Sequence, residues 1–172
     1  MMKQFVLGGA RSGKSSLAEK LCASYGDKVA YIATANKAFN DGEMDARIAK
    51  HQQQRPQHWH TIEAPIALAG ALAQLQHYDA VMIDCLTLWL SNCLHEGNWP
   101  QQRQDFLKAL ENFNGELIMV SNEVGMGIVP LGELSRSFVD ESGFLHQAVA
   151  ALCERVIFTA AGLPLVMKGP AL

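Results

Sequence analysis

Short apolar runs alternate along most of the chain with longer stretches that mix polar and apolar residues. The short runs are typical of buried strands, and the stretches between them favour helices because they contain few helix-breaking residues. The predicted strands are residues 5–7, 29–33, 59–63, 80–84, 115–121 and 155–160, and the predicted helices are residues 15–25, 43–55, 66–76, 86–94, 101–112, 134–139 and 142–153. Strands that alternate with helices predict a doubly wound, mostly parallel α/β sheet with helices on both faces.

Turn-forming residues mark several of these boundaries. Gly26 predicts a left-handed end to the first helix, and Pro56 ends the polar helix that precedes it. Residues 98–100 separate two helices, and residues 163–168 are expected to fold back as a hairpin strand along the sheet edge. Because no repeat, low-complexity tract or linker interrupts the sequence, we expect residues 1–172 to form a single domain.

The first predicted strand runs into the sequence GGARSGKS, which fits the P-loop pattern G-x-x-x-x-G-K-[ST]. Its glycines allow the backbone to curl so that successive N–H groups face a phosphate, and the following helix adds its positive dipole end. Lys14 can reach the outer phosphates of a nucleotide, and Ser15 offers its hydroxyl to a magnesium ion. The residues expected to bind nucleotide phosphates are Gly8, Gly9, Ala10, Arg11, Ser12, Gly13, Lys14 and Ser15.

Polar residues follow two of the predicted strands at the ends where open parallel sheets bind ligands. Thr34, Ala35 and Asn36 follow the strand at 29–33, and they either face the nucleotide or form a plain polar turn. Asp84 ends an apolar strand in the Walker B pattern. Its carboxylate can accept a hydrogen bond from magnesium-bound water or bind the nucleotide directly, although it could also simply open the next turn.

The polar helix at 43–55 places three basic or titratable side chains on one face. Arg47, His51 and Arg55 are four residues apart, a spacing that aligns them while the helix persists. Neighbouring cations disfavour the imidazolium form, so His51 would be neutral and nucleophilic near pH 7, and the arginines could hold a phosphate against it. The residues alone still favour a solvated polar face over this arrangement.

Composition narrows the class of protein. The 172 residues are 49% hydrophobic and 18% charged, which is typical of a globular chain, and the net charge of −3 gives no general attraction to nucleic acid. The four cysteines form no C-x-x-C pair, and neither a signal peptide nor a membrane-spanning run is evident, so we expect a cytoplasmic protein with reduced thiols. The residues alone therefore indicate a P-loop nucleotide-dependent transferase or NTPase.

Four stretches of the chain resemble the family of bifunctional adenosylcobinamide kinases and adenosylcobinamide-phosphate guanylyltransferases of cobalamin biosynthesis. They are spread over nearly the whole chain. They are residues 8–15, residues 31–34, the set Arg47, Ile48, His51, Arg55, Pro56, Trp59, Thr61 and Glu63, and the glycine-rich loop at 120–130. This last stretch is long and rare among other P-loop proteins, so the combination is specific.

The resemblance implies two successive reactions. A nucleoside triphosphate, ATP or GTP, first phosphorylates the aminopropanol hydroxyl of adenosylcobinamide. GTP then guanylylates His51, which passes GMP to adenosylcobinamide phosphate and yields adenosylcobinamide-GDP, a form of covalent catalysis. The resemblance also implies bound Mg²⁺, a homotrimer, and GTP contacts from Thr34, Ala35, Asn36, Gln52, Gln53, Gln54, Arg55, Glu63 and Asp84.

Some residues depart from the family pattern or leave alternatives open. Val139 and Asp140 stand where relatives often have Arg-Asp, and Phe144 and His146 stand where Arg and Asn are common. Other histidines (His58 and His60) are rival nucleophiles by residue type, and either Asp84 or Glu123 could be the base of the kinase step. Alternative functions are the guanylyltransferase step alone, or a nucleotide-sensing module without turnover.

Overall fold

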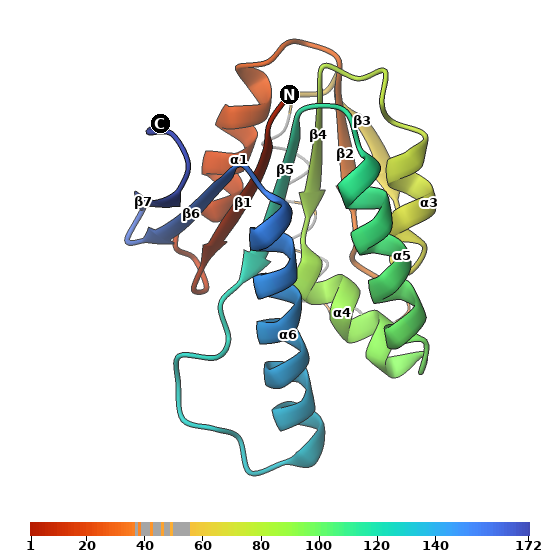
Figure 1. The fold of residues 1–172 in the computed structure, drawn as a ribbon, viewed down its shortest axis with the longest axis vertical. Helices are drawn as coiled ribbons and strands as arrows, with labels where there is room; N and C mark the ends of the chain where they lie inside the picture. Colours follow the sequence, from red (N-terminus) through yellow and green to blue (C-terminus); the bar gives the residue numbers. More distant parts are fainter. Residues whose placement is uncertain (37, 39–41, 43–45, 47–48, 50–55) are drawn as a thin grey trace.

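A computed structural model describes residues 1–36, 38, 42, 46, 49 and 56–172 of the chain. The described residues form a seven-stranded sheet in the order β3-β2-β4-β5-β1-β6-β7 (Figure 1). The strands are β1 (Lys3–Gly8), β2 (Val29–Ala33), β3 (His60–Glu63), β4 (Ala80–Asp84), β5 (Leu117–Asn122), β6 (Arg155–Ala160) and β7 (Leu163–Lys168). The predicted doubly wound α/β sheet is confirmed.

The described pairings among β1 to β6 are parallel, and only β7 pairs antiparallel, with β6. The predicted edge hairpin is therefore confirmed. Gly8 pairs with Asn122, and Asp84 pairs with both Val120 and Ala33, so the carboxyl ends of these strands lie side by side. This edge of the sheet, its lower edge in Figure 1, carries the P-loop.

Helices cover both faces of the sheet (Figure 1). α1 (Lys14–Ala23) packs on one face. α3 (Leu68–Ala73), α4 (Leu86–His95), α5 (Trp99–Asn112) and α6 (Glu133–Leu152) cover the other. Successive strand residues point to opposite faces, and because both faces are covered the strands read as continuous apolar runs.

The alternation is visible in the two cores. Phe5 and Leu7 of β1 belong to the core under α3 to α6, whereas Val6 between them belongs to the core under α1. The first core also buries Trp89 of α4 and Phe106 of α5, whose rings lie 4.9 Å apart. Alternate residues along each strand therefore face opposite sides of the sheet. The same alternation decides on which side each polar residue at a strand end lies.

The first two helices differ at their ends from the prediction. α1 ends at Ala23, and its capping residue is Ser24, whose hydroxyl donates to the Leu21 carbonyl (2.7 Å). Gly26, the predicted cap, lies beyond the helix in the turn, where an added Cβ would lie less than 3.0 Å from the Asp79 carboxylate. α3 begins only at Leu68.

The later helices are longer than predicted. α5 begins at Trp99 with Pro100 in its first turn, a position where the missing N–H of proline has no cost. α6 is one continuous helix rather than two: Glu141 in the expected gap accepts the Trp99 indole N–H (2.7 Å), and Phe138 just before the gap packs on the core. Within the described part of the chain, no helix is both long and apolar enough to cross a membrane.

Candidate nucleotide-binding site

The P-loop joins the end of β1 to the start of α1 and requires glycine at two places. A Cβ on Gly8 would lie less than 3.0 Å from the Thr159 carbonyl oxygen of β6. Gly13 has φ 96°, a left-handed conformation that side chains disfavour. The loop is also braced from β6, because the hydroxyls of Ser12 and Thr159 lie 2.8 Å apart and the Gly162 N–H donates to the Ser12 carbonyl (3.0 Å).

Lys14 lies against the loop rather than extending into solvent. Its side chain is buried, and the ammonium group donates to the Gly9 carbonyl. Burial lowers the pKa of Lys14, while the neighbouring Cys85 and Asp84 act in the opposite direction. The loop thus holds a partly desolvated cation over its own backbone.

Asp84 is the meeting point of three elements. Its Oδ2 atom accepts hydrogen bonds from the Ser15 hydroxyl of α1 (3.2 Å) and from the Tyr31 hydroxyl of β2 (2.9 Å). Ser15 and Asp84 were each predicted as site residues, whereas Tyr31 was not. The signal for Tyr31 was a phenol inside an apolar strand, since a buried hydroxyl needs a partner.

Thr34 joins the ends of β2 and β4 through hydrogen bonds. Its hydroxyl donates to the Cys85 carbonyl (2.7 Å) and accepts the Cys85 N–H (2.9 Å), and its own carbonyl accepts from Asn92 of α4 (2.8 Å). The Thr34 side chain is fully buried, while Asn36 beyond it accepts the Ala38 N–H (3.0 Å). The sequence predicted Thr34 at this edge, but it did not predict the hydrogen bonds of Thr34 with Cys85 and Asn92.

Glu63 reaches the same edge from a neighbouring strand. It ends β3, where it is exposed, and it pairs with Ala33, which in turn pairs with Asp84. Glu63 and Asp84 therefore lie on one row across the sheet with β2 between them. Both carboxylates thus lie at the edge of the sheet that carries the P-loop, Asp84 hydrogen-bonded to Ser15 and Tyr31 and Glu63 exposed at the end of β3.

Several predicted site residues lie outside the described residues. These are His51, Gln52, Gln53, Gln54 and Arg55, together with most of the polar helix that was expected to carry them. Of the rival histidines, His60 begins β3 and contacts the Tyr78 hydroxyl. It therefore lies at the amino end of its strand, whereas the P-loop lies at the carboxyl ends.

The oxygen ligands at the site suit one kind of metal. Among the described residues, no group of three or more His, Cys, Asp or Glu side chains could hold a metal ion. The Ser15 hydroxyl beside the Asp84 carboxylate (3.2 Å) does suit Mg²⁺, which binds few protein oxygens and completes its shell with water and phosphate.

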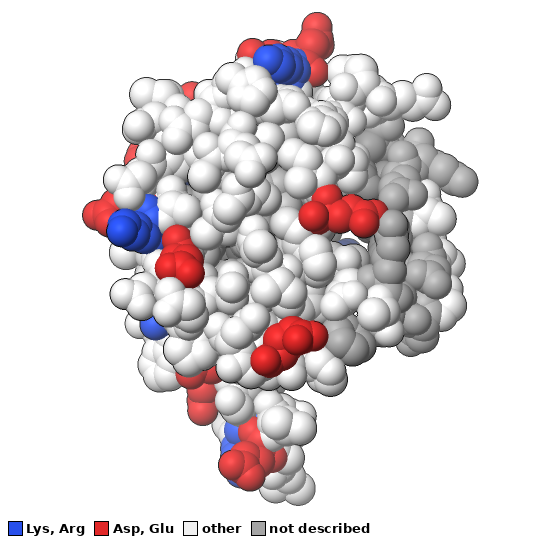
Figure 2. Space-filling view, turned by 90° about the vertical axis from the view of Figure 1, so that its right-hand side faces the viewer, with Lys and Arg blue, Asp and Glu red and all other residues white. Residues whose placement is uncertain are grey.

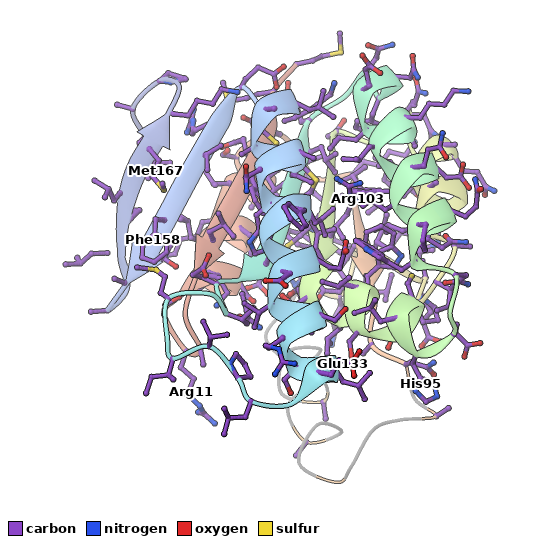
Figure 3. All side chains as sticks on the ribbon, turned by 60° about the horizontal axis from the view of Figure 1, so that its bottom comes forward. Arg11, His95, Arg103, Glu133, Phe158 and Met167 are labelled. Carbon is purple, nitrogen blue, oxygen red and sulfur yellow. The ribbon has the colours of Figure 1, made fainter. Side chains whose placement is uncertain are left out.

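Positive charge is dispersed on the face of the molecule that Figure 2 draws. On the face drawn in Figure 2, the Lys and Arg residues that the structure describes are scattered near the margin and form no patch. The loop before α6 is instead apolar and exposed, with Met126, Ile128, Val129 and Leu131 at its surface. Figure 3 shows this loop and Glu133, which follows it, at the same end of the molecule as Arg11 of the P-loop.

Solved structures of other proteins share this fold. The flagellar accessory protein FlaH from Methanocaldococcus jannaschii matches with a TM-score of 0.56 and 14% identity, over 98% of this chain and 78% of that one. A KaiC-like protein from Pyrococcus horikoshii OT3 matches with a TM-score of 0.54 and 12% identity, over 98% and 79%. At such identities the likeness defines the fold alone, which together with the loop at 8–15 is that of the P-loop NTPases.

The chain belongs to the cobinamide kinase / cobinamide phosphate guanyltransferase family, whose model matches residues 4–167. It is 52% identical over 175 residues to the bifunctional adenosylcobalamin biosynthesis protein CobP of Pseudomonas aeruginosa, covering 99% of this chain and 100% of the relative. It is also 35% identical over 184 residues to CobU of Escherichia coli, covering 97% and 100%. The predicted family membership is therefore confirmed.

Proposed function

We propose that this chain phosphorylates adenosylcobinamide on its aminopropanol hydroxyl and then transfers GMP from GTP to the new phosphate. Family membership supports both activities. The observation that carries the chemistry is the contact between the Ser15 hydroxyl and the Asp84 carboxylate (3.2 Å), at the start of the helix that follows the P-loop. Phosphoryl transfer depends mainly on positioning and on neutralising charge, and this contact lies where both are needed.

In the proposed site the P-loop N–H groups from Gly8 to Ser15 surround the phosphates of ATP or GTP. Lys14, held over the loop through the Gly9 carbonyl, exchanges that partner for the outer phosphates. Ser15 and Asp84 would hold Mg²⁺, directly or through its water, and the bound ion would supply positive charge that offsets the charge of the triphosphate. Tyr31 fixes the Asp84 carboxylate through its hydroxyl.

The second reaction uses His51 as the proposed nucleophile. The neutral imidazole attacks the α-phosphorus of GTP, so that a P–N bond forms, the α–β bridging P–O bond breaks, and pyrophosphate leaves with the electron pair. The phosphate of adenosylcobinamide phosphate then displaces the imidazole and receives GMP. Arg47 and Arg55, spaced like His51 on the predicted helix, would hold the phosphates.

Guanine recognition is the proposed task of Glu63. A carboxylate can accept hydrogen bonds from guanine N1–H and the 2-amino group, which adenine cannot offer in the same way. Asp84 lies against Ser15 at the P-loop, where phosphates and metal are expected, whereas Glu63 lies two strands further along the same sheet edge, which favours Glu63 for the base. The P-loop pattern adds Ala10, Arg11 and Ser12 as proposed phosphate contacts. The remaining nucleotide contacts proposed from the resemblance are Thr34, Ala35, Asn36, Gln52, Gln53, Gln54 and Arg55.

We also propose a cytoplasmic homo-oligomer, a trimer by resemblance, built from single-domain chains. Large exposed apolar surfaces are typical of protein interfaces. The described residues include two such surfaces: the loop before α6, where Ile128 and Leu131 are 98% and 97% exposed, and edge strand β7, where Leu163 and Met167 are 72% and 62% exposed. Sedimentation equilibrium of the purified protein tests the assembly, and a monomer at micromolar concentration would contradict it.

Sequential incubation tests the two activities. The protein with adenosylcobinamide, ATP and Mg²⁺ should yield adenosylcobinamide phosphate, and later addition of GTP should yield adenosylcobinamide-GDP and pyrophosphate, as followed by chromatography and mass spectrometry. If GTP reacts only with adenosylcobinamide phosphate supplied ready-made, the chain is a guanylyltransferase alone. If nucleotide binds without any product, the alternative of a nucleotide-sensing module holds.

A further inference from the structure

A chain of buried polar side chains links α4, β5 and α6 beside the P-loop. The Asn122 N–H donates to the Thr87 hydroxyl oxygen (2.7 Å), and that hydroxyl lies 3.1 Å from the Ser121 hydroxyl. Ser121 Oγ lies in turn 2.8 Å from Nε2 of His146, which is 8% exposed. Ser142, one helical turn before His146, lies 3.4 Å from the same nitrogen.

The hydrogen bonds that join these side chains can all be donated in one direction, from Thr87 towards His146. Because the Thr87 oxygen already accepts the Asn122 N–H, its own proton can be donated to Ser121, and the Ser121 proton to Nε2 of His146. Nδ1 then carries the ring proton, and it lies 3.9 Å from Oε2 of Glu123. The opposite tautomer would direct the Nδ1 lone pair at a carboxylate, which is unfavourable.

His146 therefore presents an N–H dipole to Glu123 as a neutral ring. Burial lowers the pKa of His146, and the nearby Glu123 opposes that shift. Among the described residues, Glu123 is the charged group that lies against the His146 ring. The other neighbours of the ring are the hydroxyls of Ser121 and Ser142 and the ring of Phe5.

Glu123 is attached to the P-loop through its backbone. Its N–H donates to the carbonyl of Gly8 (2.9 Å), the first residue of the P-loop, and its Oε1 atom accepts the Gly125 N–H. Strand parity places Asp84 on the α1 face of the sheet with Tyr31, and Glu123 on the α6 face with Ser121. The two carboxylates thus lie on opposite faces of the sheet, at the edge that carries the P-loop.

We propose that Glu123 accepts the proton of the acceptor hydroxyl in the kinase step, and that His146 positions Glu123 for this. As the hydroxyl oxygen bonds to the terminal phosphorus, the bridging P–O bond breaks, its electron pair leaves with the nucleoside diphosphate, and the hydroxyl proton passes to Glu123. The assignment rests on the proposed kinase activity. Asp84 is already committed to the Ser15 and Tyr31 hydroxyls on the metal side.

Glu123→Gln tests the catalytic role, because it keeps the size of the side chain and removes the base. We expect kcat for phosphorylation of adenosylcobinamide to fall by about 10²–10⁴-fold. Guanylylation of the protein by GTP alone should stay within about threefold of wild type, since that reaction involves no hydroxyl acceptor. Both activities are measured on the full-length protein with Mg²⁺.

Three other results of this experiment would overturn the assignment of Glu123. Kinase activity near the wild-type level in Glu123→Gln would overturn the assignment. Loss of both activities at an unchanged melting temperature would also overturn it, because Glu123 would then serve nucleotide binding. A wild-type protein that guanylylates itself but never phosphorylates adenosylcobinamide would instead overturn the proposed kinase function, and the assignment with it.

Two variants of His146 test the positioning role. The amide nitrogen of Asn can occupy the place of imidazole Nδ1, so His146→Asn keeps a donor facing Glu123, whereas His146→Gln places its amide near Ser121 instead. We expect kinase kcat within about threefold of wild type for His146→Asn and about tenfold lower for His146→Gln, with KM unchanged in both. If kcat follows the melting temperature, or if His146→Gln is the more active variant, His146 is only structural and the positioning role is overturned.

Discussion

Single side chains at the site either neutralise phosphate charge or orient the groups that do. Lys14 of the P-loop is buried and held over the Gly9 carbonyl, whereas Arg11 of the same loop is exposed. Its role was predictable from sequence because the P-loop spacing fixes it. Thr87 and His146 were not, since the hydrogen bonds that join them to Ser121 connect elements far apart in the chain.

Lys14→Ala should abolish both activities, because each uses the triphosphate of a nucleotide. We expect kcat to fall by about 10²–10³-fold or more for phosphorylation and for guanylylation alike. Steady-state rates of the two reactions measure this. Lys20→Ala is the matched control, since Lys20 lies exposed in the last turn of the same helix and should leave both rates unchanged.

Tyr31→Phe should weaken magnesium binding, because the Asp84 carboxylate loses the hydroxyl that orients it (2.9 Å). Outer-shell partners of this kind change metal affinity by tenfold or more, so the Mg²⁺ concentration for half-maximal activity should rise about tenfold. Titration of activity with Mg²⁺ measures the change.

Tyr25→Phe is the control for that experiment. The Tyr25 hydroxyl accepts a hydrogen bond from Gln4 (2.9 Å), so the Tyr25→Phe variant, like Tyr31→Phe, should lose about 1 kcal/mol of the free energy of unfolding. Its Mg²⁺ requirement should stay at the wild-type value. An equal rise in both variants would show that lost stability, rather than the Asp84 contact, causes the effect.

Strands were predicted better than helix ends. The apolar runs place β2, β4 and β6 at their observed residues, because strands covered on both faces are continuously hydrophobic. Helix ends depend on tertiary contacts that a local pattern does not contain. α3 begins late, where the Pro65 and Ile66 carbonyls instead accept the side chains of Asn92 and Trp89.

The link between the P-loop and β6 gives a prediction at this scale. Gly8→Ala should destabilise the protein by 1–3 kcal/mol or more, in the range typical of overpacking, because the new Cβ meets the Thr159 carbonyl at less than 3.0 Å. Gly9→Ala in the same loop has nothing within 4 Å of the new Cβ and should unfold near the wild-type midpoint. Urea unfolding followed by circular dichroism compares them, and equal midpoints would contradict the close packing of this loop on β6.

The whole molecule gathers the strand ends into one edge that carries the P-loop, Asp84, Glu63 and Glu123. The α/β class, the P-loop and the carboxyl-end rule predicted this edge from the sequence. The face that each carboxylate approaches needed the structure, because it follows from strand order and parity. His51 remains a prediction, since it lies outside the described residues.

The central claim is that a histidine accepts the nucleotide while the P-loop holds the pyrophosphate that leaves. Incubation with GTP labelled at the α-phosphorus, followed by denaturation, tests it most directly. The wild-type protein should retain label that is released by acid and resists base, as a phosphoramidate does, and His51→Ala should retain none. Label that persists in His51→Ala, or its absence from the wild-type protein, would contradict the account.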